Sequence, residues 1–400
     1  MITSKNKYIE EVCSKIKSKY LKKEIANELD THISENMKEK MKQGLTKEEA
    51  EKESICSMGN AEDIANQIND VHKSKFDIKS FAILLLIIVI GIIINVQLYK
   101  SQGQNLSTTI YDYVFINIVG VSIGVIGYFI SYKLFEKLNI VLYILASLIS
   151  LIPIILKINI PGTTLISALL YVLWFSKFVY YKNNTTFSEI LKSFLILISL
   201  IILTFSNSFL VAISLLLAYI SIYFCNLNKF SHKSIVIGLS TNFILIALFT
   251  YVLLMFGSPY RLELIKNAVP TIDNVQANNF INDYQNSQML SYALNNYNLI
   301  FFITILITYF LLIFLVIKNI KKIKEIYGKN ITIGLITIIL FQAIICILSN
   351  LAIIPRLYSS IYLISFNGIE SIFFLVSMSI IMCIYKEKDY YSSYCKNNIE

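Results

Sequence analysis

The sequence predicts an all-α protein, in which a small cytosolic helical bundle precedes a polytopic membrane domain of about ten transmembrane helices. Three observations predict this. Apolar residues make up 56% of the 400 residues and charged residues 15%, whereas soluble domains contain about 45–50% and about 25%. Residues 1–79 hold 15 Lys and 15 Asp or Glu. Long apolar runs begin only near residue 80. Soluble enzymes, disulfide scaffolds, disordered proteins and nucleic-acid binders fit this pattern poorly.

Residues 1–75 are predicted to form the cytosolic bundle. Apolar residues recur at helical spacing, and Thr46 with Glu49 matches a capping box, in which each side chain binds the backbone amide of the other. The histidines and cysteines of this region show neither metal-ligand nor CxxC spacing. We therefore predict an interaction or regulatory module rather than an enzyme, with helices over 5–18, 20–42, 46–58 and 61–71.

The membrane domain is predicted to cover residues 80–386, followed by a cytosolic tail at 387–400. A span needs about 20 mostly apolar residues. The sequence offers ten such runs, at about 80–99, 111–132, 138–156, 162–181, 190–205, 208–225, 235–257, 298–317, 331–352 and 362–385.

The orientation follows from the first apolar run and from the positive charges. The first run starts near Phe81, too late for a cleaved leader, so the N-terminus is expected in the cytosol. The loops then on the cytoplasmic side carry 15 Lys, and the outer loops carry five Lys or Arg. This asymmetry obeys the positive-inside rule and predicts that both termini are cytoplasmic.

One predicted outer loop, at 258–297, is far longer than its neighbours. Loops of about 40 residues without obvious secondary structure are often functional. This loop contains Arg261, Glu263, Asp273 and Asp283. A solvated loop would carry similar charges, so these residues are candidates rather than an established site.

The N-terminal region resembles a known module. The phrase "IANELDTHISENMKEKMKQGLTKEEAEKESICSMGNAEDIANQINDVH" is similar to the small helical prefix domain found before many bacterial permease-type proteins. The shared features are an "EL..HI.E" helix, a "G(L/M)..EEAE" turn and an "MG....IA..I" ending. The resemblance implies that a cytosolic regulator binds residues 1–75.

Two segments of the membrane domain carry a further resemblance. One is "YGKNITIGLITIILFQAIICILSNLAIIPRLYSSIYLISFNGIES", and the other is "SPYRLELI" in the outer loop, followed by Pro270 and Asp273. Together with ten spans and a long loop after the seventh, they resemble the SEDS family (shape, elongation, division and sporulation), which includes FtsW, RodA and SpoVE. The first segment is similar to a family stretch that ends in TGIPLPFISYGGSS, and the second to the family's outer-loop segment. The matched positions in the first segment are Gly328, Gly334, Phe341, Gln342, Pro355, Ser365 and Gly368.

This resemblance implies a peptidoglycan polymerase of the bacterial cytoplasmic membrane. Such enzymes polymerise lipid II, a lipid-linked disaccharide-peptide, usually beside a class B penicillin-binding-type transpeptidase. The chemistry needs a base for the sugar hydroxyl and stabilisation of the departing diphosphate by cations or a divalent metal. No cofactor is otherwise indicated. The substrate-binding candidates are Arg261, Gln342, Ser365, Gly368 and Glu370.

The sequence departs from the family at the expected base. Ser287, or Gln288 with a shift of one residue, stands where the family has a loop aspartate. Asp283 and Asp273 are the replacement candidates, so the sequence leaves open whether the chain is an enzyme. The alternatives are a translocator of the lipid-linked precursor and a non-catalytic scaffold or regulator of a cell-wall synthase.

Three of the candidate residues can be interpreted in either structural or functional terms. Gln342 either bonds a neighbouring helix or contributes to a lipid-diphosphate cavity. Arg261 either binds a diphosphate or anchors the loop at the membrane interface. Glu370 lies near the outer end of the last span, where a carboxyl group is costly unless it is paired or solvated.

Overall fold

A computed structural model describes most of the chain as helices. The described residues are 4–16, 21–71, 77–101, 106–156, 162–178, 195–196, 198–203, 209–226, 290, 299–323, 325–351, 353, 362–364 and 368–388. The chain divides into two compact units. The first, called the N-terminal unit, comprises Met1–Phe76 with Lys386–Glu400, and the second, called the membrane unit, is Asp77–Tyr385.

The N-terminal unit contains four helices in its described residues. They are α1 (Lys5–Lys15), α2 (Leu21–Lys42), α3 (Lys47–Met58) and α4 (Ala61–Val71). Residues three and four apart share one face of a helix, so the apolar positions of these helices meet in one core. The Tyr8 hydroxyl donates to the Gly59 carbonyl oxygen at 3.1 Å and ties α1 to the end of α3.

The predicted capping box begins α3. The Glu49 amide donates to the Thr46 hydroxyl at 3.4 Å, and the Thr46 amide and hydroxyl donate to the Glu49 carboxylate at 3.1 and 2.7 Å. The hydroxyl bond, with the amide bond, holds the pKa of Glu49 below its usual value of 4.5. This pKa shift stabilises the folded unit above pH 4.5, and the contribution is lost as the pH falls through the lowered pKa.

Thr46→Ala is expected to weaken the start of α3 by about 1 kcal/mol, because it removes the N-cap hydroxyl. Hydrogen exchange of the α3 amides in the full-length protein, corrected for intrinsic rates, measures the change. The difference from wild type should shrink below about pH 4.5. Thr31→Ala on α2, which loses a bond to its own helix, is the control and should leave α3 unchanged. Equal protection of α3 in wild type and Thr46→Ala would contradict the prediction.

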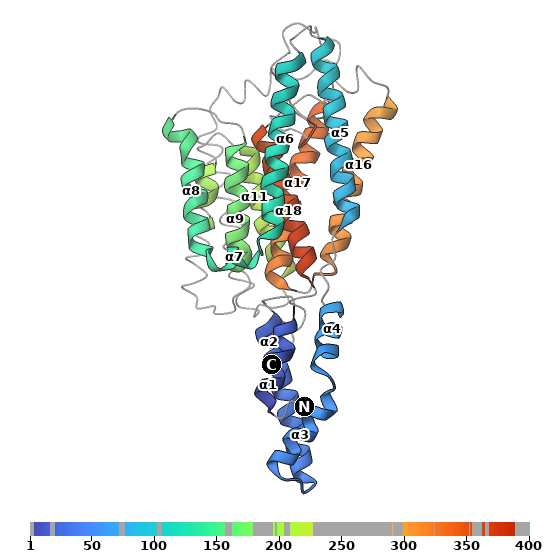
Figure 1. The fold of residues 1–400 in the computed structure, drawn as a ribbon. Coiled ribbons are helices and arrows are strands. Elements are labelled where there is room, and N and C mark those ends of the chain that lie inside the picture. The colour runs from blue at the N-terminus through green and yellow to red at the C-terminus, as the bar shows by residue number, and fades with distance from the viewer. Residues whose placement is uncertain are drawn as a thin grey trace. The chain divides into compact units, whose positions relative to one another are not determined.

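The described helices of the membrane unit coincide with eight of the ten predicted spans (Figure 1). The fifth run is helical over 198–203, and the seventh lies outside the described residues. The short α7 (Lys133–Lys137) links two of the eight. These eight are α5 (Ile78–Ser101), α6 (Leu106–Phe129), α8 (Asn139–Leu156), α9 (Thr163–Phe178), α11 (Phe209–Cys225), α16 (Leu299–Ile320), α17 (Ile326–Asn350) and α18 (Gly368–Glu387).

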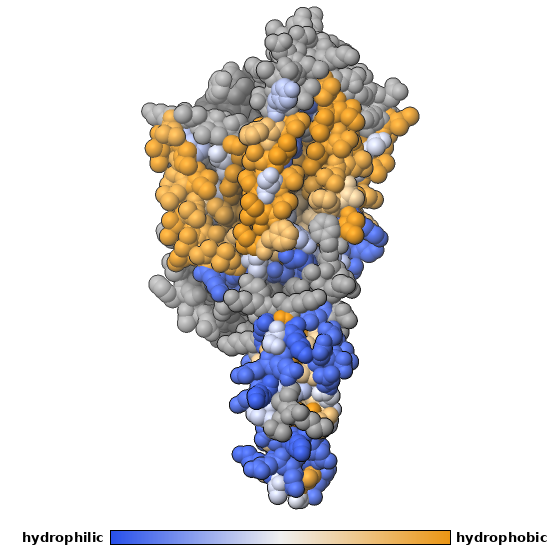
Figure 2. Space-filling view, viewed as in Figure 1, coloured by the Kyte–Doolittle hydropathy of each residue, from blue (hydrophilic) through white to orange (hydrophobic). Residues whose placement is uncertain are grey.

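Length and hydropathy mark this unit as a multi-pass membrane protein. Within the described residues, five helices are long and apolar enough to span a bilayer, and three apolar ones are shorter. Large apolar side chains are exposed along α5, α6, α8 and α16. They form the broad hydrophobic surface of Figure 2. In water such a surface would be unfavourable, so it indicates contact with lipid.

Helices α17 and α18 supply the interior of the unit. Most side chains in their apolar windows are buried, whereas most of those in α5, α8 and α16 are not. Small residues permit the close packing. A Cβ on Gly120 or Gly124 of α6 would lie 2.6 Å from Leu375 or 2.5 Å from Ser379 of α18. Glycines four residues apart let membrane helices approach closely.

The helices of the membrane unit run between two ends, which we call proximal and distal. At the proximal end α5 and α17 begin and α18 ends; at the distal end α9, α16 and α18 begin (Figure 1). Polar side chains join α11 to α17. The Asn226 amide donates to Asn330 at 2.8 Å, and the hydroxyls of Ser221 and Thr337 lie 3.1 Å apart. Hydrogen bonds of this kind between membrane helices help to hold α17 against α11.

Candidate functional site

The start of α18 holds two of the predicted site residues. Gly368 is its first residue, and a Cβ there would lie 2.8 Å from Ile116 of α6, so glycine permits this contact. Glu370 lies in the first turn and is 6% exposed. A carboxylate is favoured at a helix N-terminus by the helix dipole. Gly162 (φ +87°), where a Cβ would lie 3.1 Å from the Glu370 Cγ, brings the start of α9 against this side chain.

Helix α17 presents a row of polar groups near the distal end. Gln342 is 4% exposed, and Cys346 and Asn350 follow at intervals of four residues, which places the three on one face. The Asn350 amide donates to the Cys346 carbonyl oxygen at 2.8 Å and lies 3.3 Å from the sulfur. Gln342 is therefore an interior residue of α17, as its position in an apolar run predicts.

A buried turn at 362–364 precedes α18. Its three residues are almost inaccessible to solvent, and Leu363 adopts φ +67°. Non-glycine residues seldom adopt a positive φ, so the surroundings must hold this backbone. Asn95 of α5 does so in part, since its amide donates to the Ile364 carbonyl oxygen at 2.9 Å and to Gly91 at 2.7 Å.

Aromatic rings join this turn to α16 and α18. Tyr309 and Tyr362 each stack on Phe374, with ring centroids 5.8 and 5.5 Å apart. Glu370, Tyr309 and Cys346 lie close enough to Tyr362 for a charge on any of them to act on its hydroxyl. Residues distant in sequence therefore meet at one place. We call it the distal polar cluster; its members are Asn95, Tyr309, Gln342, Cys346, Tyr362 and Glu370.

The structure thus describes three predicted site residues, Gln342, Gly368 and Glu370. The other candidates, together with the two positions aligned to the family's loop aspartate, lie outside the described residues; they are Arg261, Asp273, Asp283, Ser287, Gln288 and Ser365. Over the described ranges, no group of three or more His, Cys, Asp or Glu side chains gathers into a metal-binding arrangement.

Sequence reasoning missed Asn95, Tyr309 and Tyr362. Asn95 interrupts the apolar run IIINVQL, and a polar residue within a span was the available signal. Tyr309 and Tyr362 gave none, because tyrosine occurs 26 times in the chain.

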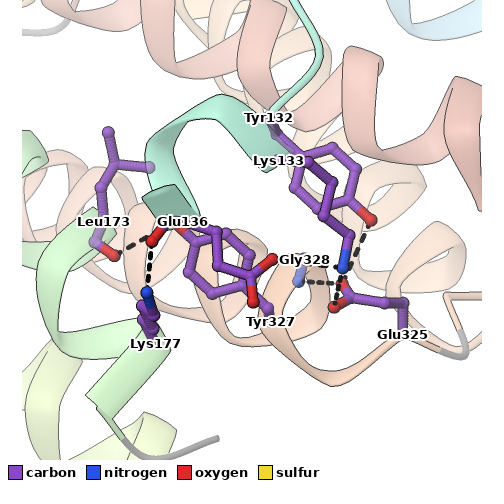
Figure 3. A network of polar contacts seen from close by, with 8 residues as sticks. All are labelled: Tyr132, Lys133, Glu136, Leu173, Lys177, Glu325, Tyr327 and Gly328. Atoms are coloured by element: carbon purple, nitrogen blue, oxygen red, sulfur yellow. Dashed lines mark hydrogen bonds and ion pairs between the residues drawn. The ribbon is translucent and has the colours of Figure 1, made fainter. Parts of the chain in front are cut away.

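A buried ion pair at the proximal end was also missed (Figure 3). Glu325, 3% exposed, directly precedes α17. Its carboxylate accepts from the Lys133 ammonium at 3.0 Å and from the Tyr132 hydroxyl at 3.1 Å. It also caps α17 by accepting from the Gly328 amide. With three donors, the carboxylate is well satisfied and links α7 to α17.

Further bonds extend this network to α9. The Lys177 ammonium donates to the Glu136 carbonyl oxygen, and the Tyr327 hydroxyl to the Leu173 carbonyl oxygen at 3.4 Å (Figure 3). The rings of Tyr327 and Tyr132 stack at 6.1 Å. These contacts connect α7, the end of α9 and the start of α17. The network at the proximal end therefore has a structural role. The distal polar cluster remains the candidate site.

Comparison with solved structures decides the fold. The Thermus thermophilus rod shape determining protein RodA superposes with a TM-score of 0.57 at 12% identity, over 78% of this chain and 97% of RodA. An aspartate-to-alanine variant of RodA gives 0.58 at 13%, over 78% and 98%. The chain has the RodA fold. The predicted SEDS-like, all-α polytopic architecture is therefore confirmed.

A third structure shares the RodA fold. It belongs to a study of how a peptidoglycan synthase complex coordinates polymerization and crosslinking, and matches with a TM-score of 0.58 at 13% identity, over 78% of this chain and 98% of that one. No protein-family model matches the sequence. No curated protein matches it either. The RodA fold is thus evident from the three-dimensional arrangement at very low sequence identity.

Proposed function

We propose that this protein works in peptidoglycan assembly in the bacterial cytoplasmic membrane, where it binds a lipid II-type precursor and polymerises its disaccharide. The RodA fold carries the proposal, because the match spans nearly the whole of the RodA chain. A membrane-embedded polymerase needs buried polar groups that face a lipid-linked substrate. Gln342 and Glu370 of the distal polar cluster are polar side chains buried among apolar helices.

The proposed chemistry is attack of a sugar hydroxyl on the anomeric carbon of a second precursor, with the lipid diphosphate leaving. A carboxylate takes the hydroxyl proton, and a cation stabilises the diphosphate. In this sequence Asp283 or Asp273 takes the first role and Arg261 the second, since a guanidinium pairs well with phosphate oxygens. Ser365, Gly368 and Glu370 are proposed to line the substrate site.

The decisive experiment supplies purified full-length protein with lipid II and follows glycan chains by gel electrophoresis. Wild type should form polymer. Replacing Asp273 and Asp283 together with alanine should reduce the rate about 100-fold or more, the usual contribution of a general base. Asp63→Ala, in the N-terminal unit, is the control and should polymerise normally. No polymer from the wild-type protein would refute the polymerase.

A second possibility is a non-catalytic function, either translocation of the precursor or scaffolding of a synthase. This possibility is favoured because Ser287 or Gln288, neither of which is a carboxylate base, stands at the family's aspartate position. A translocator would move labelled lipid II across proteoliposomes without forming polymer. A scaffold would do neither, but would co-purify with a cell-wall synthase.

Partners are proposed on the same basis. Because a structure with this fold comes from a complex that couples polymerization to crosslinking, we propose a class B penicillin-binding-type transpeptidase as partner. We also propose that both termini are cytoplasmic and that residues 1–75 bind a cytosolic regulator. Affinity purification under growth, division and sporulation conditions would show which process uses the protein.

A further inference from the structure

The Asn95 Oδ1 atom and the hydroxyls of Tyr309 and Tyr362, all in the distal polar cluster, are buried without a hydrogen-bond partner among the residues that the structure describes. All three residues are at least 97% buried. Buried polar groups in native proteins are almost always bonded, and an unbonded one costs about 1–3 kcal/mol. Three such atoms on neighbouring elements indicate a binding partner that is absent from the bare protein.

The chemistry of these atoms defines the partner. Asn95 Oδ1 can only accept, so the partner must donate at least one hydrogen bond. Tyrosine hydroxyls both donate and accept. A diphosphate offers acceptors only, and the cluster, as far as its residues are described, contains the Glu370 carboxyl group but neither Lys nor Arg. Hydroxyl and amide groups together meet these requirements, and both occur on N-acetylated sugars.

The surroundings also suit a sugar. The two tyrosines are held by stacking on Phe374, and Tyr362 lies against Phe373 at 5.6 Å. Sites of this kind are lined by apolar and aromatic groups with a few placed polar groups. The turn that carries Tyr362 keeps a positive φ at Leu363, a conformation that is costly and is often found at ligand sites.

Resting on the proposed function, we infer that Asn95, Tyr309 and Tyr362 bind the sugar portion of the lipid-linked substrate, while its diphosphate binds elsewhere. The two phenols select for the sugar. Each contributes a hydrogen bond that forms only when the substrate is present, so each affects binding and not the stability of the empty protein.

The test uses full-length protein in detergent, two probes and two single variants. The probes are lipid II and undecaprenyl diphosphate, which shares the lipid and the diphosphate but lacks the sugars. Tyr309→Phe and Tyr362→Phe should each weaken lipid II binding about tenfold, and leave undecaprenyl diphosphate binding unchanged. The melting temperature of each empty variant should equal or exceed that of wild type, because the lost hydroxyl had no partner.

Tyr219→Phe is the matched control. Tyr219 is equally buried, but its hydroxyl lies 3.2 Å from that of Ser199. Its loss should lower the melting temperature and leave binding of both probes unchanged. The inference is overturned if the two cluster variants bind lipid II like wild type. It is also overturned if they melt early without ligand, since their hydroxyls would then already be bonded. A wild-type protein that fails to bind lipid II would instead refute the proposed function.

Discussion

Lys133→Met is expected to destabilise the membrane unit by about 3 kcal/mol, at the lower end of the range for breaking a buried ion pair from one side. The variant leaves the Glu325 carboxylate almost fully buried without its ammonium partner at 3.0 Å. The Tyr132 hydroxyl and the Gly328 amide still donate to it, which limits the loss. Thermal unfolding of the detergent-solubilised protein should show a melting temperature several degrees lower.

Two further variants separate the charge from the packing. Lys133→Met combined with Glu325→Gln should recover part of the stability, because the charge of the almost fully buried Glu325 is removed together with that of its partner. Glu136, which Lys133 also pairs with at 3.4 Å, keeps its charge in this double variant and limits the recovery. Lys137→Met, on the exposed side of the same short helix, removes an equal charge and should change little. If Lys133→Met and Lys137→Met melt at the same temperature, the ion pair does not stabilise the protein.

Gly334→Leu is expected to have an effect of similar size through packing. A Cβ at Gly334 would lie 2.6 Å from Val172 Cγ1 of α9 and 2.8 Å from Ile222 Cδ1 of α11. Val172 is branched at Cβ and cannot easily rotate away. Overpacking a tight interior costs about 1–3 kcal/mol and sometimes more. The variant should melt several degrees lower, because α17 must move away from α9 or α11.

Gly127→Ala on α6 is the control, because its nearest neighbour would lie 3.9 Å from the new methyl group. It should melt like wild type. The smaller substitution Gly334→Ala should also lower the melting temperature, because its Cβ meets the Val172 Cγ1 methyl group. Combining it with Val172→Ala, which removes that methyl group, should restore part of the lost stability. Wild-type stability of Gly334→Leu would show that the two helices can separate at no cost.

Most helices could be predicted because their signals are local. A span requires about 20 apolar residues wherever it lies in the bundle, and eight predicted runs coincide with described helices. The capping box at Thr46 and Glu49 likewise depends on residues three apart. The RodA fold could be expected from the number of spans and the motif around Gly334 and Gln342.

Two boundaries show where local signals fail. The last run was predicted to span 362–385, whereas α18 begins at Gly368 and 362–364 form a turn. Hydropathy cannot distinguish a buried turn from a helix, so the predicted helix start at about 362 was wrong. The preceding run was predicted to start at 331, but α17 begins at Ile326. Glutamate is not among the preferred N-cap residues, so its capping of Gly328 gave no signal.

The sequence by itself determined which segments are helical, which of them suit lipid, and the family that their order resembles, because hydropathy, capping and helical spacing act over a few residues. Only the tertiary structure decided which polar groups meet. Lys133 and Glu325 lie 192 residues apart, and Asn95 and Ile364 lie 269 apart. No hydrophobic periodicity in the sequence encodes contacts between residues so far apart. They form when packing excludes water from both polar groups, because each buried group then needs a hydrogen-bond partner within the protein.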